Sequence, residues 1–311
     1  MFFKTYFLVG GAGFLGSHFI DALLKQTTTQ KVVIYDNFSS GRMWHYAHHQ
    51  SDHRLTIVSA DVKEFDKLRE SMQGCEVVIH LASNPDIARA SSEPSIDFLE
   101  GTMLTHHVLE AARQTRVKRL LYTSGSGVYG DVGMQETAEN YSPMRPISTY
   151  GASKLAGEAL ISSYCHLFQM TAAAFRFGNI VGPRQTHGVG LDFIKKLLQN
   201  PSQLTILGDG MQSKSYIHVE DAVSAVLWAN EKQTFAYDVY NVATNDYITV
   251  QDIAKITIES MGITDPILFQ YTGGDRGWKG DVPRVRLNTD KIPYLCNSPQ
   301  WYEIHNSCLI H

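Results

Sequence analysis

Two side chains suited to acid–base chemistry, Tyr150 and Lys154, stand four positions apart. In a helix, residues at this spacing lie on the same face. A phenol has a pKa near 10 and is a poor base at neutral pH. A neighbouring ammonium group stabilises the phenolate, and lowering the phenol pKa by about 3 units corresponds to ~4 kcal/mol. The pair therefore predicts a general base, Tyr150, tuned by Lys154 and suited to removing a hydroxyl proton.

A glycine-rich turn lies near the start of the chain. Residues 10–16 read GGAGFLG, satisfy the spacing GxGxxG and follow an apolar run. Glycines allow the backbone to approach a pyrophosphate, whose charge is stabilised at the N-terminus of the helix that follows. Asp36 lies 20 residues after Gly16, where a carboxylate accepts hydrogen bonds from an adenosine ribose. The pattern predicts a dinucleotide site and favours NAD over NADP, although Arg42 is near enough in sequence to accommodate a 2′-phosphate.

These residues must be positioned by regular elements, and the first half of the chain supplies them in alternation. Short apolar runs predict buried parallel strands, and the segments between them have the length of helices. The expected strands are 6–9, 31–35, 55–59, 77–81, 119–123 and 171–176, and the expected helices are 14–26, 63–72, 95–115 and 151–168. The order predicts a doubly wound parallel (Rossmann) sheet of class α/β. The carboxyl ends of its third and fourth strands place Asp61 and Val62 beside an adenine and Leu81, Ala82 and Ser83 near the middle of the cofactor.

The pattern changes after residue 180. Glycine and proline punctuate the chain and the elements become short and mixed, with helices expected at 219–230 and 250–261. We therefore expect two domains, a dinucleotide-binding domain over 1–178 and a smaller mixed α/β substrate lobe over 179–311. The chain is expected to cross between them more than once.

Composition and charge exclude several classes of protein. The 311 residues carry 27 Lys and Arg against 31 Asp and Glu, and no long basic run provides a surface for nucleic acid. No window reaches the ~18 uncharged apolar residues of a membrane span, and the first apolar stretch does not resemble a signal peptide. Four scattered cysteines without a CxxC pair argue against disulfides or structural zinc. A cytoplasmic protein without a nucleic-acid or membrane partner is expected.

Taken together, the motifs resemble those of the extended short-chain dehydrogenase/reductases that act on nucleotide sugars, and most closely the UDP-sugar 4-epimerases. The resemblance rests on the segments 10–16, 36–37, 80–82, 128–130, 150–154, 176–179, 182–184, 216–221 and 280–283. It implies a tightly held NAD, a transient 4-keto sugar and Tyr150 as the base for the 4-hydroxyl proton. The residues then expected to bind the cofactor are Gly10, Gly13, Phe14, Leu15, Gly16, Asp36, Asn37, Asp61, Val62, Leu81, Ala82, Ser83, Tyr150, Lys154 and Phe177.

Three positions depart from the family pattern. Gly125 stands where these enzymes carry the Ser or Thr that hydrogen-bonds the sugar 4-hydroxyl, so Ser124 or Ser126 is expected to supply that hydroxyl, with a slight preference for Ser126. Lys214 replaces an Arg that contacts a substrate phosphate and offers no bidentate fork. Phe98 replaces an Asn near the cofactor, which removes one hydrogen bond.

The second lobe is expected to hold a nucleoside diphosphate sugar. The candidate substrate-binding residues are Asn84, Asn179, Arg184, Lys214 and Arg276. The helices expected at 95–115 and 151–168 carry more apolar surface than one sheet face needs. In the resembling family such helices pair across a dimer, so a homodimer is expected. No metal is expected: His45, His48, His49 and His53 cluster after Asp36 but lack an HExxH pattern, and they are interpreted as a solvated surface.

The favoured function is NAD-dependent epimerisation at C4 of a UDP-sugar. The alternative within enzymes is a 4,6- or 5,6-dehydratase or a simple nucleotide-sugar oxidoreductase. The Asp-Glu pair of the 4,6-dehydratases is absent at Ser126 and Gly127, and only Asn84, Asp86 and Tyr129 lie near the expected site by motif position. An alternative outside enzymes is an NAD-binding scaffold weakened at Gly125.

Overall fold

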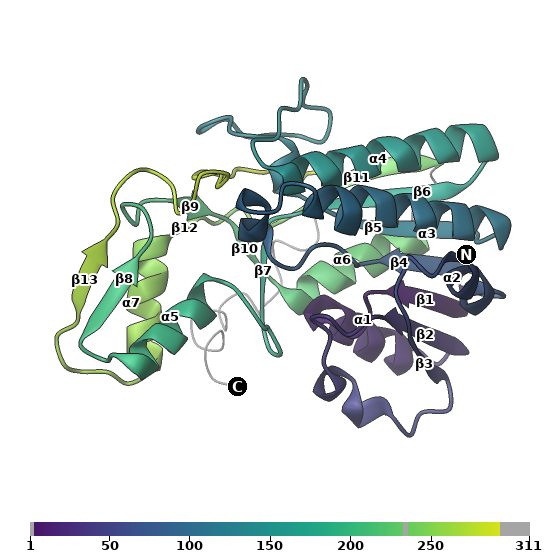
Figure 1. Ribbon diagram of the computed structural model, residues 1–311, viewed down its shortest axis with the longest axis horizontal. Coiled ribbons are helices and arrows are strands. Elements are labelled where there is room, and N and C mark those ends of the chain that lie inside the picture. Colours follow the sequence, from purple (N-terminus) through teal and green to yellow (C-terminus); the bar gives the residue numbers. More distant parts are fainter. Residues whose placement is uncertain (1–2, 233–235, 293–311) are drawn as a thin grey trace.

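Seven parallel strands form the centre of the molecule. The computed structural model describes residues 3–232 and 236–292, and its sheet has the strand order β11-β6-β5-β4-β1-β2-β3 (Figure 1). The strands are β1 (Thr5–Val9), β2 (Lys31–Asp36), β3 (Leu55–Ser59), β4 (Val77–His80), β5 (Arg119–Gly125), β6 (Thr171–Phe177) and β11 (Tyr237–Val242). The central strands are buried on both faces, which explains why they read as continuous apolar runs.

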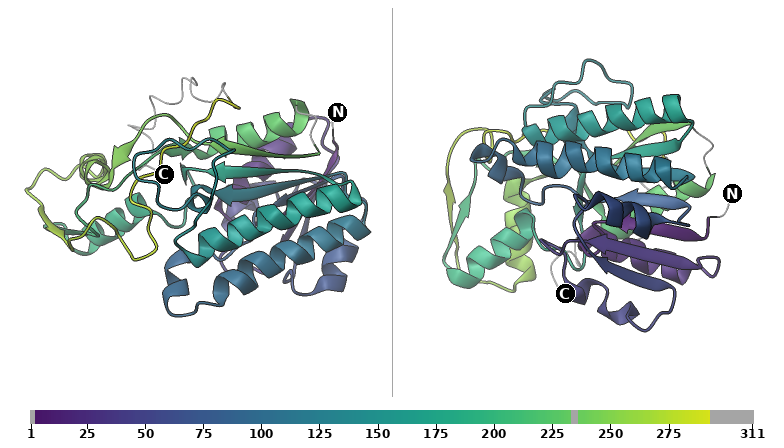
Figure 2. Two further views of the ribbon diagram at one scale, coloured as in Figure 1. Left: turned by 90° about the horizontal axis from the view of Figure 1, so that it is seen from above. Right: turned by 45° about the vertical axis from the view of Figure 1, so that its right-hand side comes forward.

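Helices cover both faces of this sheet (Figure 2). One hydrophobic core joins the sheet to α1 (Phe14–Lys25) and α6 (Val219–Lys232), which lie side by side. A second core joins the opposite face to α2 (Phe65–Met72), α3 (Met103–Gln114) and α4 (Thr149–Phe168). The doubly wound α/β fold expected from the sequence is confirmed, and so are six of its strands.

The seventh strand was not predicted. β11 pairs in parallel with β6, with Tyr240 opposite Phe175 and Val242 opposite Phe177. Together with α6 it returns the chain to the first layer long after residue 178. α6 and β11 thus pack with the central sheet although both follow residue 178.

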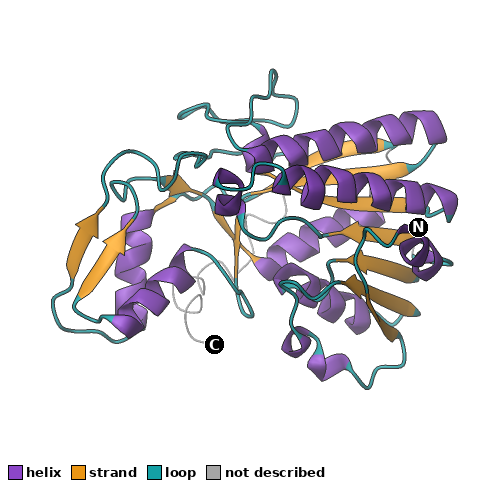
Figure 3. Ribbon diagram, in the orientation of Figure 1, coloured by secondary structure: helices purple, strands orange, loops and turns teal. Residues whose placement is uncertain are grey.

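A smaller lobe is built from α5 (Val189–Gln199), α7 (Val250–Ser260) and a parallel pair, β8 (Gln203–Ile206) and β13 (Leu268–Tyr271), around a separate core (Figure 3). Two short pairs connect it to the first lobe: β7 (Asn179–Val181) with β10 (Tyr216–His218), and β9 (Ser213–Lys214) with β12 (Ile248–Thr249). None of the helices described is both long and apolar enough to span a membrane. Cys75 and Cys165 are buried free thiols, whereas Cys296, Cys308 and the aromatic tail 301–311 lie outside the described residues.

A buried ion pair fixes α4 against the sheet. The Arg176 guanidinium on β6 donates to both carboxylate oxygens of Glu158 on α4, with Nη2 2.7 Å from Oε2, and the two side chains are only 3% and 4% exposed. Its remaining nitrogen, Nη1, donates to the Tyr129 hydroxyl at 2.8 Å and to the Glu139 carbonyl at 3.0 Å. Because every part of the guanidinium is satisfied, the pair tolerates its burial.

Replacing Glu158 with Ala would leave the Arg176 charge buried without a partner. We expect the free energy of unfolding to fall by about 3–5 kcal/mol. Chemical denaturation followed by circular dichroism measures it, with Glu259→Ala as the control because Glu259 is an exposed residue of α7. Equal stability of the two variants would show that the ion pair does not hold α4 in place.

Candidate active site

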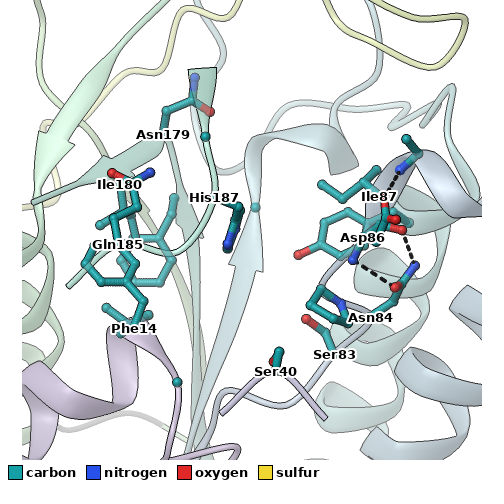
Figure 4. A pocket seen from close by; sticks show the side chains of 18 of the residues that line it. Phe14, Ser40, Ser83, Asn84, Asp86, Ile87, Asn179, Ile180, Gln185 and His187 are labelled. Atoms are coloured by element: carbon teal, nitrogen blue, oxygen red, sulfur yellow. Dashed lines mark hydrogen bonds between the residues drawn. The ribbon is translucent and has the colours of Figure 1, made fainter. Parts of the chain in front are cut away.

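A cavity of about 1660 Å³ lies between the two lobes, at the carboxyl ends of the central strands. This is where ligands bind in open parallel sheets. Its volume exceeds the ~300–1,000 Å³ of a site for one small molecule, so it has room for a dinucleotide and a second ligand. Figure 4 shows Phe14, Ile180 and Gln185 along one side of the cavity and Asn84, Asp86 and Ile87 along the other.

The glycine-rich turn forms the floor of the cavity. Gly10 has a φ of +77°, and a Cβ there would lie 2.7 Å from the Ala82 backbone nitrogen. A Cβ on Gly16 would lie 2.3 Å from the Gly11 carbonyl oxygen. Gly13 caps α1 without a side-chain hydrogen bond, which leaves the amides of the first turn available to a phosphate.

Asp36 is held rigidly at the end of β2. Its Oδ2 accepts a hydrogen bond from the Ala12 amide at 2.9 Å and its Oδ1 accepts one from the Phe38 amide at 2.8 Å. Burial raises the pKa of Asp36 above the usual carboxyl range. Each oxygen keeps a further lone pair for a ribose hydroxyl. Arg42 instead donates to the Gly41 carbonyl and does not line the cavity.

The structure gathers every residue predicted to bind the dinucleotide. All fifteen of them, from the glycine-rich turn to Phe177, line the cavity. Asn37 reaches its neighbour Asp61 rather than open space, with Nδ2 2.8 Å from Oδ2. The residues thus fit an extended dinucleotide running from Asp36 across the glycines to Tyr150.

Tyr150 and Lys154 lie in the first turns of α4, which Ser148 caps by accepting a hydrogen bond from the Gly151 amide. The Lys154 Nζ lies 5.5 Å from the centre of the Tyr150 ring and donates to the Thr123 carbonyl at 2.7 Å. Burial lowers the pKa of Lys154 to about 8. Burial also raises the pKa of Tyr150, although a hydrogen bond with the Ser83 side chain opposes this. Both shifts disfavour a phenolate at Tyr150 beside an ammonium at Lys154.

The loop after β5 decides which hydroxyl is available. The Ser124 hydroxyl donates a hydrogen bond to Glu158 Oε1 at 2.5 Å and is thereby part of the buried ion-pair network. Ser126 opens a short 3₁₀ turn, η5 (Ser126–Val128), and lines the cavity. Gly125 has an extended backbone, and a Cβ built there meets no atom within 4 Å. Of the two predicted hydroxyls, only that of Ser126 is left unused by the fold.

The predicted substrate residues behave differently from one another. Asn179 lines the cavity and hydrogen-bonds with Tyr216, and Lys214 lines it with its Nζ 2.5 Å from Asp281 Oδ1. Asn84 also lines it, but its amide is used by the protein: Nδ2 donates to the Asp86 carbonyl and to Asp97.

Two of the predicted cations point elsewhere. Arg184 donates to Asp21 on α1 and to the His45 carbonyl. Arg276 does not line the cavity; it forms an ion pair with Asp131 at 2.6 Å. Arg184 still lines the cavity, and substrate binding by these two guanidiniums stays a prediction. Both are already paired with acidic partners from distant parts of the chain, which spacing does not reveal.

The position of Phe98 also corrects an expectation. Phe98 begins a π-turn, η4 (Phe98–Thr102), is 59% exposed and does not line the cavity. It therefore removes no hydrogen bond from the cofactor. The polar residue buried at this point is its neighbour Asp97, which sequence reasoning missed; the only signal was one acidic residue within an otherwise apolar run from Ile96 to Leu99.

The histidine cluster is partly ordered around Asp21. His48 and His49 both place Nε2 within 2.8 Å of Asp21 Oδ1, and these three side chains come close enough to hold a metal ion. His53 does not belong to this group. Arg184 neutralises the other oxygen of Asp21, which disfavours a further cation there. His45 is buried between the Ala12 and Arg184 carbonyls.

Comparison with known proteins agrees with this architecture. The profile of the NAD dependent epimerase/dehydratase family matches residues 6–243. The UDP-glucose 4-epimerase of Mycolicibacterium smegmatis is 33% identical over 91% of this chain and 90% of its own. A crystal structure of a UDP-galactose 4-epimerase superposes with a TM-score of 0.81, at 37% identity over 94% of this chain and 91% of that one. The dTDP-glucose 4,6-dehydratase of Actinoplanes sp. is 26% identical over 96% and 98%.

The fold and the site therefore define an NAD-dependent enzyme of nucleotide-sugar metabolism. The chain belongs to the NAD dependent epimerase/dehydratase family, within the extended short-chain dehydrogenase/reductases. Its cofactor is NAD.

Gly125→Ser tests the open space at the end of β5. Since a Cβ at this position meets nothing within 4 Å and the backbone is extended, we expect the free energy of unfolding to change by less than about 0.5 kcal/mol. Gly130→Ser is the matched control: Gly130 has a φ of +80°, and its Cβ would lie 1.9 Å from the Arg145 carbonyl oxygen, so a loss of about 2 kcal/mol or more is expected. Thermal unfolding compares the two, and equal losses would mean that no space exists at Gly125.

Proposed function

We propose that this enzyme epimerises a UDP-hexose at C4 through a transient 4-keto sugar, with Tyr150 as the base. The observation that carries the proposal is the placement of Tyr150 and Lys154 in the same cavity as the glycine-rich turn, at the point where the two lobes meet. The names of the relatives favour a uridine nucleotide, since two of those compared act on UDP-sugars.

Each protein group has a defined task in this reaction. Bound NAD supplies the hydride acceptor and later the hydride donor. Tyr150 takes the proton of the 4-hydroxyl as the C4 hydride leaves, and returns it after the keto sugar presents its other face. Lys154 stabilises the phenolate by its charge and is placed to hold the nicotinamide ribose. No net oxidation occurs, so the cycle needs no other reductant.

The carboxylates of the cavity argue for epimerisation over dehydration. A dehydratase needs an acid and a base near C5 and C6 of the sugar. Among the described residues, each carboxylate that lines the cavity is already hydrogen-bonded or ion-paired: Asp36, Asp61, Asp86, Glu93, Glu100, Asp192 and Asp281. Asp86, the one suggested by motif position, caps the short helix η3 (Ile87–Ser91) through the Ala88 and Arg89 amides. Tyr129 is likewise engaged, because its hydroxyl donates a hydrogen bond to Asn241 and accepts one from Arg176.

Proton NMR in D₂O tests the reaction directly. Incubated with UDP-, GDP- and dTDP-hexoses, the protein is expected to invert C4 of a UDP-sugar without deuterium entering the ring. Tyr150→Phe is expected to lower kcat by about 10²–10⁴-fold, because it removes the general base. Tyr271→Phe, a change at an exposed tyrosine of β13, is the control.

Two results would contradict the proposal. Deuterium at C5 or C6, with a keto or unsaturated product, would identify a dehydratase. Undiminished turnover by Tyr150→Phe would mean that another group is the base, and an unchanged cellular role in that variant would favour a scaffold.

We also propose that the protein is a homodimer through α3 and α4. These helices lie side by side on one face of the sheet, and Leu167 and Phe168 at the end of α4 are 67% and 46% exposed. Phe98 and Leu99, just before α3, add exposed apolar surface. Exposed apolar side chains thus stand at both ends of this helix pair, where a second copy packed along the two helices would cover them.

Light scattering coupled to size exclusion is expected to give twice the chain mass of 34.8 kDa. Leu167→Asp is expected to shift the protein toward the monomer, because a charge at the interface must be desolvated. Leu198→Asp, at a 73% exposed residue of α5 in the other lobe, should leave the mass unchanged. A monomeric parent protein would refute the dimer.

A further inference from the structure

Asp97 is a buried carboxylate outside the set of residues that the proposed reaction uses. It is 1% exposed and directly precedes the π-turn η4. Its Oδ1 accepts a hydrogen bond from Asn84 Nδ2 at 2.8 Å, and its Oδ2 accepts one from Thr149 Oγ1 at 2.6 Å. No Lys, Arg or His of the described residues forms an ion pair with it. Because an unpaired buried carboxylate is costly, its retention at this point suggests a role beyond packing.

The two partners of Asp97 are the chain neighbours of two residues in the site. Asn84 follows Ser83, and Thr149 precedes Tyr150. The Ser83 side chain hydrogen-bonds with the Tyr150 hydroxyl. Asp97 therefore joins the loop after β4 to the start of α4 at the one place where these two segments bring hydroxyl groups together. Asn84 stiffens the same loop, since its Oδ1 accepts from the Asp86 amide at 3.0 Å.

Ser83 is also the hydroxyl that touches the base. At Gly125 there is no side chain, the Ser124 proton is donated to Glu158, and the Ser126 hydroxyl makes no hydrogen bond to another described residue. Ser83 lines the cavity on the same side as Asn84 and Asp86 (Figure 4), and its side chain hydrogen-bonds with Tyr150. A second hydroxyl beside the phenol stabilises charge that develops there and shares its proton with the sugar.

We propose that Ser83 supplies the second hydroxyl of the catalytic pair in place of position 125, and that Asp97 is the positioning residue that holds Ser83 against Tyr150 through Asn84 and Thr149. This inference rests on the proposed role of Tyr150 as the base. It gives the enzyme an arrangement in which the polarising hydroxyl comes from the loop after β4 rather than from the end of β5.

The charge of Asp97 has a second consequence. It raises the pKa values of Tyr150 and Lys154 together, because it disfavours the phenolate and favours the ammonium. The other groups that face this pair are Ser83 and Tyr122 toward Tyr150, and Glu158, Tyr122 and His80 toward Lys154. Removing the Asp97 charge must therefore move both the acidic and the alkaline limb of the pH–rate profile to lower pH.

Serine replacement tests the role of Ser83. Ser83→Ala is expected to lower kcat by about 10²-fold with little change in KM. A loss of this size is typical when one preorganised hydrogen-bond donor is removed from an active site. Adding Gly125→Ser to Ser83→Ala is expected to restore most of the loss, because position 125 has open space and lines the same cavity as Tyr150. Unchanged kcat in Ser83→Ala, or a loss that Gly125→Ser does not restore, would overturn this role, as would a 10²-fold loss in Ser126→Ala alone.

Two isosteric changes test Asp97. Asp97→Asn keeps a hydrogen bond to each partner, since the Thr149 hydroxyl both donates and accepts, and removes only the charge. It is expected to shift both limbs of kcat/KM to lower pH by about one unit. Thr149→Val keeps the Asp97 charge but removes the hydrogen bond between Thr149 and Asp97. We expect kcat to fall by about 10-fold or more, because the reacting groups are misplaced, while both limbs of the pH profile stay where they are. Asp66→Asn, on the exposed face of α2, is the charge control.

The effect of Asp97 on Tyr150 can be tested even if the proposed function is wrong. Ultraviolet titration of tyrosinate in the NAD-loaded protein, taken as the difference from Tyr150→Phe, reports the Tyr150 pKa without any substrate. A lower value in Asp97→Asn than in Asp66→Asn supports the coupling even if no sugar is turned over. Equal values in these two variants, or unaltered kcat in Thr149→Val, would show that Asp97 only supports the fold.

Discussion

The buried contact between Arg176 and Glu158 is the constraint on which the site depends. Tyr150, Lys154 and Glu158 succeed one another at intervals of four along α4 and therefore form one stripe on that helix. Anchoring Glu158 to β6 fixes the rotation of the helix and aims the first two members of the stripe at the carboxyl edge of the sheet. The same carboxylate accepts a hydrogen bond from the Ser124 hydroxyl, so the end of β5 is fixed by the same network. A helix held only by apolar contacts would tolerate rotations that misplace the base.

Burial of this stripe disfavours the charged forms of both Tyr150 and Lys154. Desolvation raises the pKa of Tyr150 and lowers that of Lys154 to about 8, and both changes oppose a phenolate paired with an ammonium. The positive charge of an oxidised nicotinamide in the same cavity would lower the pKa of Tyr150 and so favour its phenolate. In the proposed mechanism Tyr150 would then act as a base only while the oxidised cofactor is bound, which would link proton removal to hydride transfer. The Asp97 carboxylate strengthens this dependence by adding negative charge nearby.

Local features of the sequence predicted much of the fold and the cofactor half of the site. The apolar runs, the glycine turn and the Tyr150–Lys154 spacing depend on neighbours within a few residues, so period and spacing suffice to find them. The contacts of Arg184, Arg276 and Ser124 could not be predicted in this way. Their partners, Asp21, Asp131 and Glu158, lie 163, 145 and 34 positions away. β11 was missed for a related reason: it is a strand only because β6 offers an open edge to it.

The residues that bind the substrate were harder to predict, because the cations of the cavity already form ion pairs with carboxylates of the protein. Arg89, Arg184, Lys196 and Lys214 line the cavity, and each contacts a carboxylate. A nucleoside diphosphate must therefore displace or share these partners, and only the surplus of the new contacts contributes to affinity. Lys154 differs from these four because its ammonium faces a backbone carbonyl and two aromatic rings, with no carboxylate in ion-pair contact among the described residues. Its charge therefore remains available to Tyr150, which supports the role proposed for this lysine, whereas the other four cations order the cavity walls.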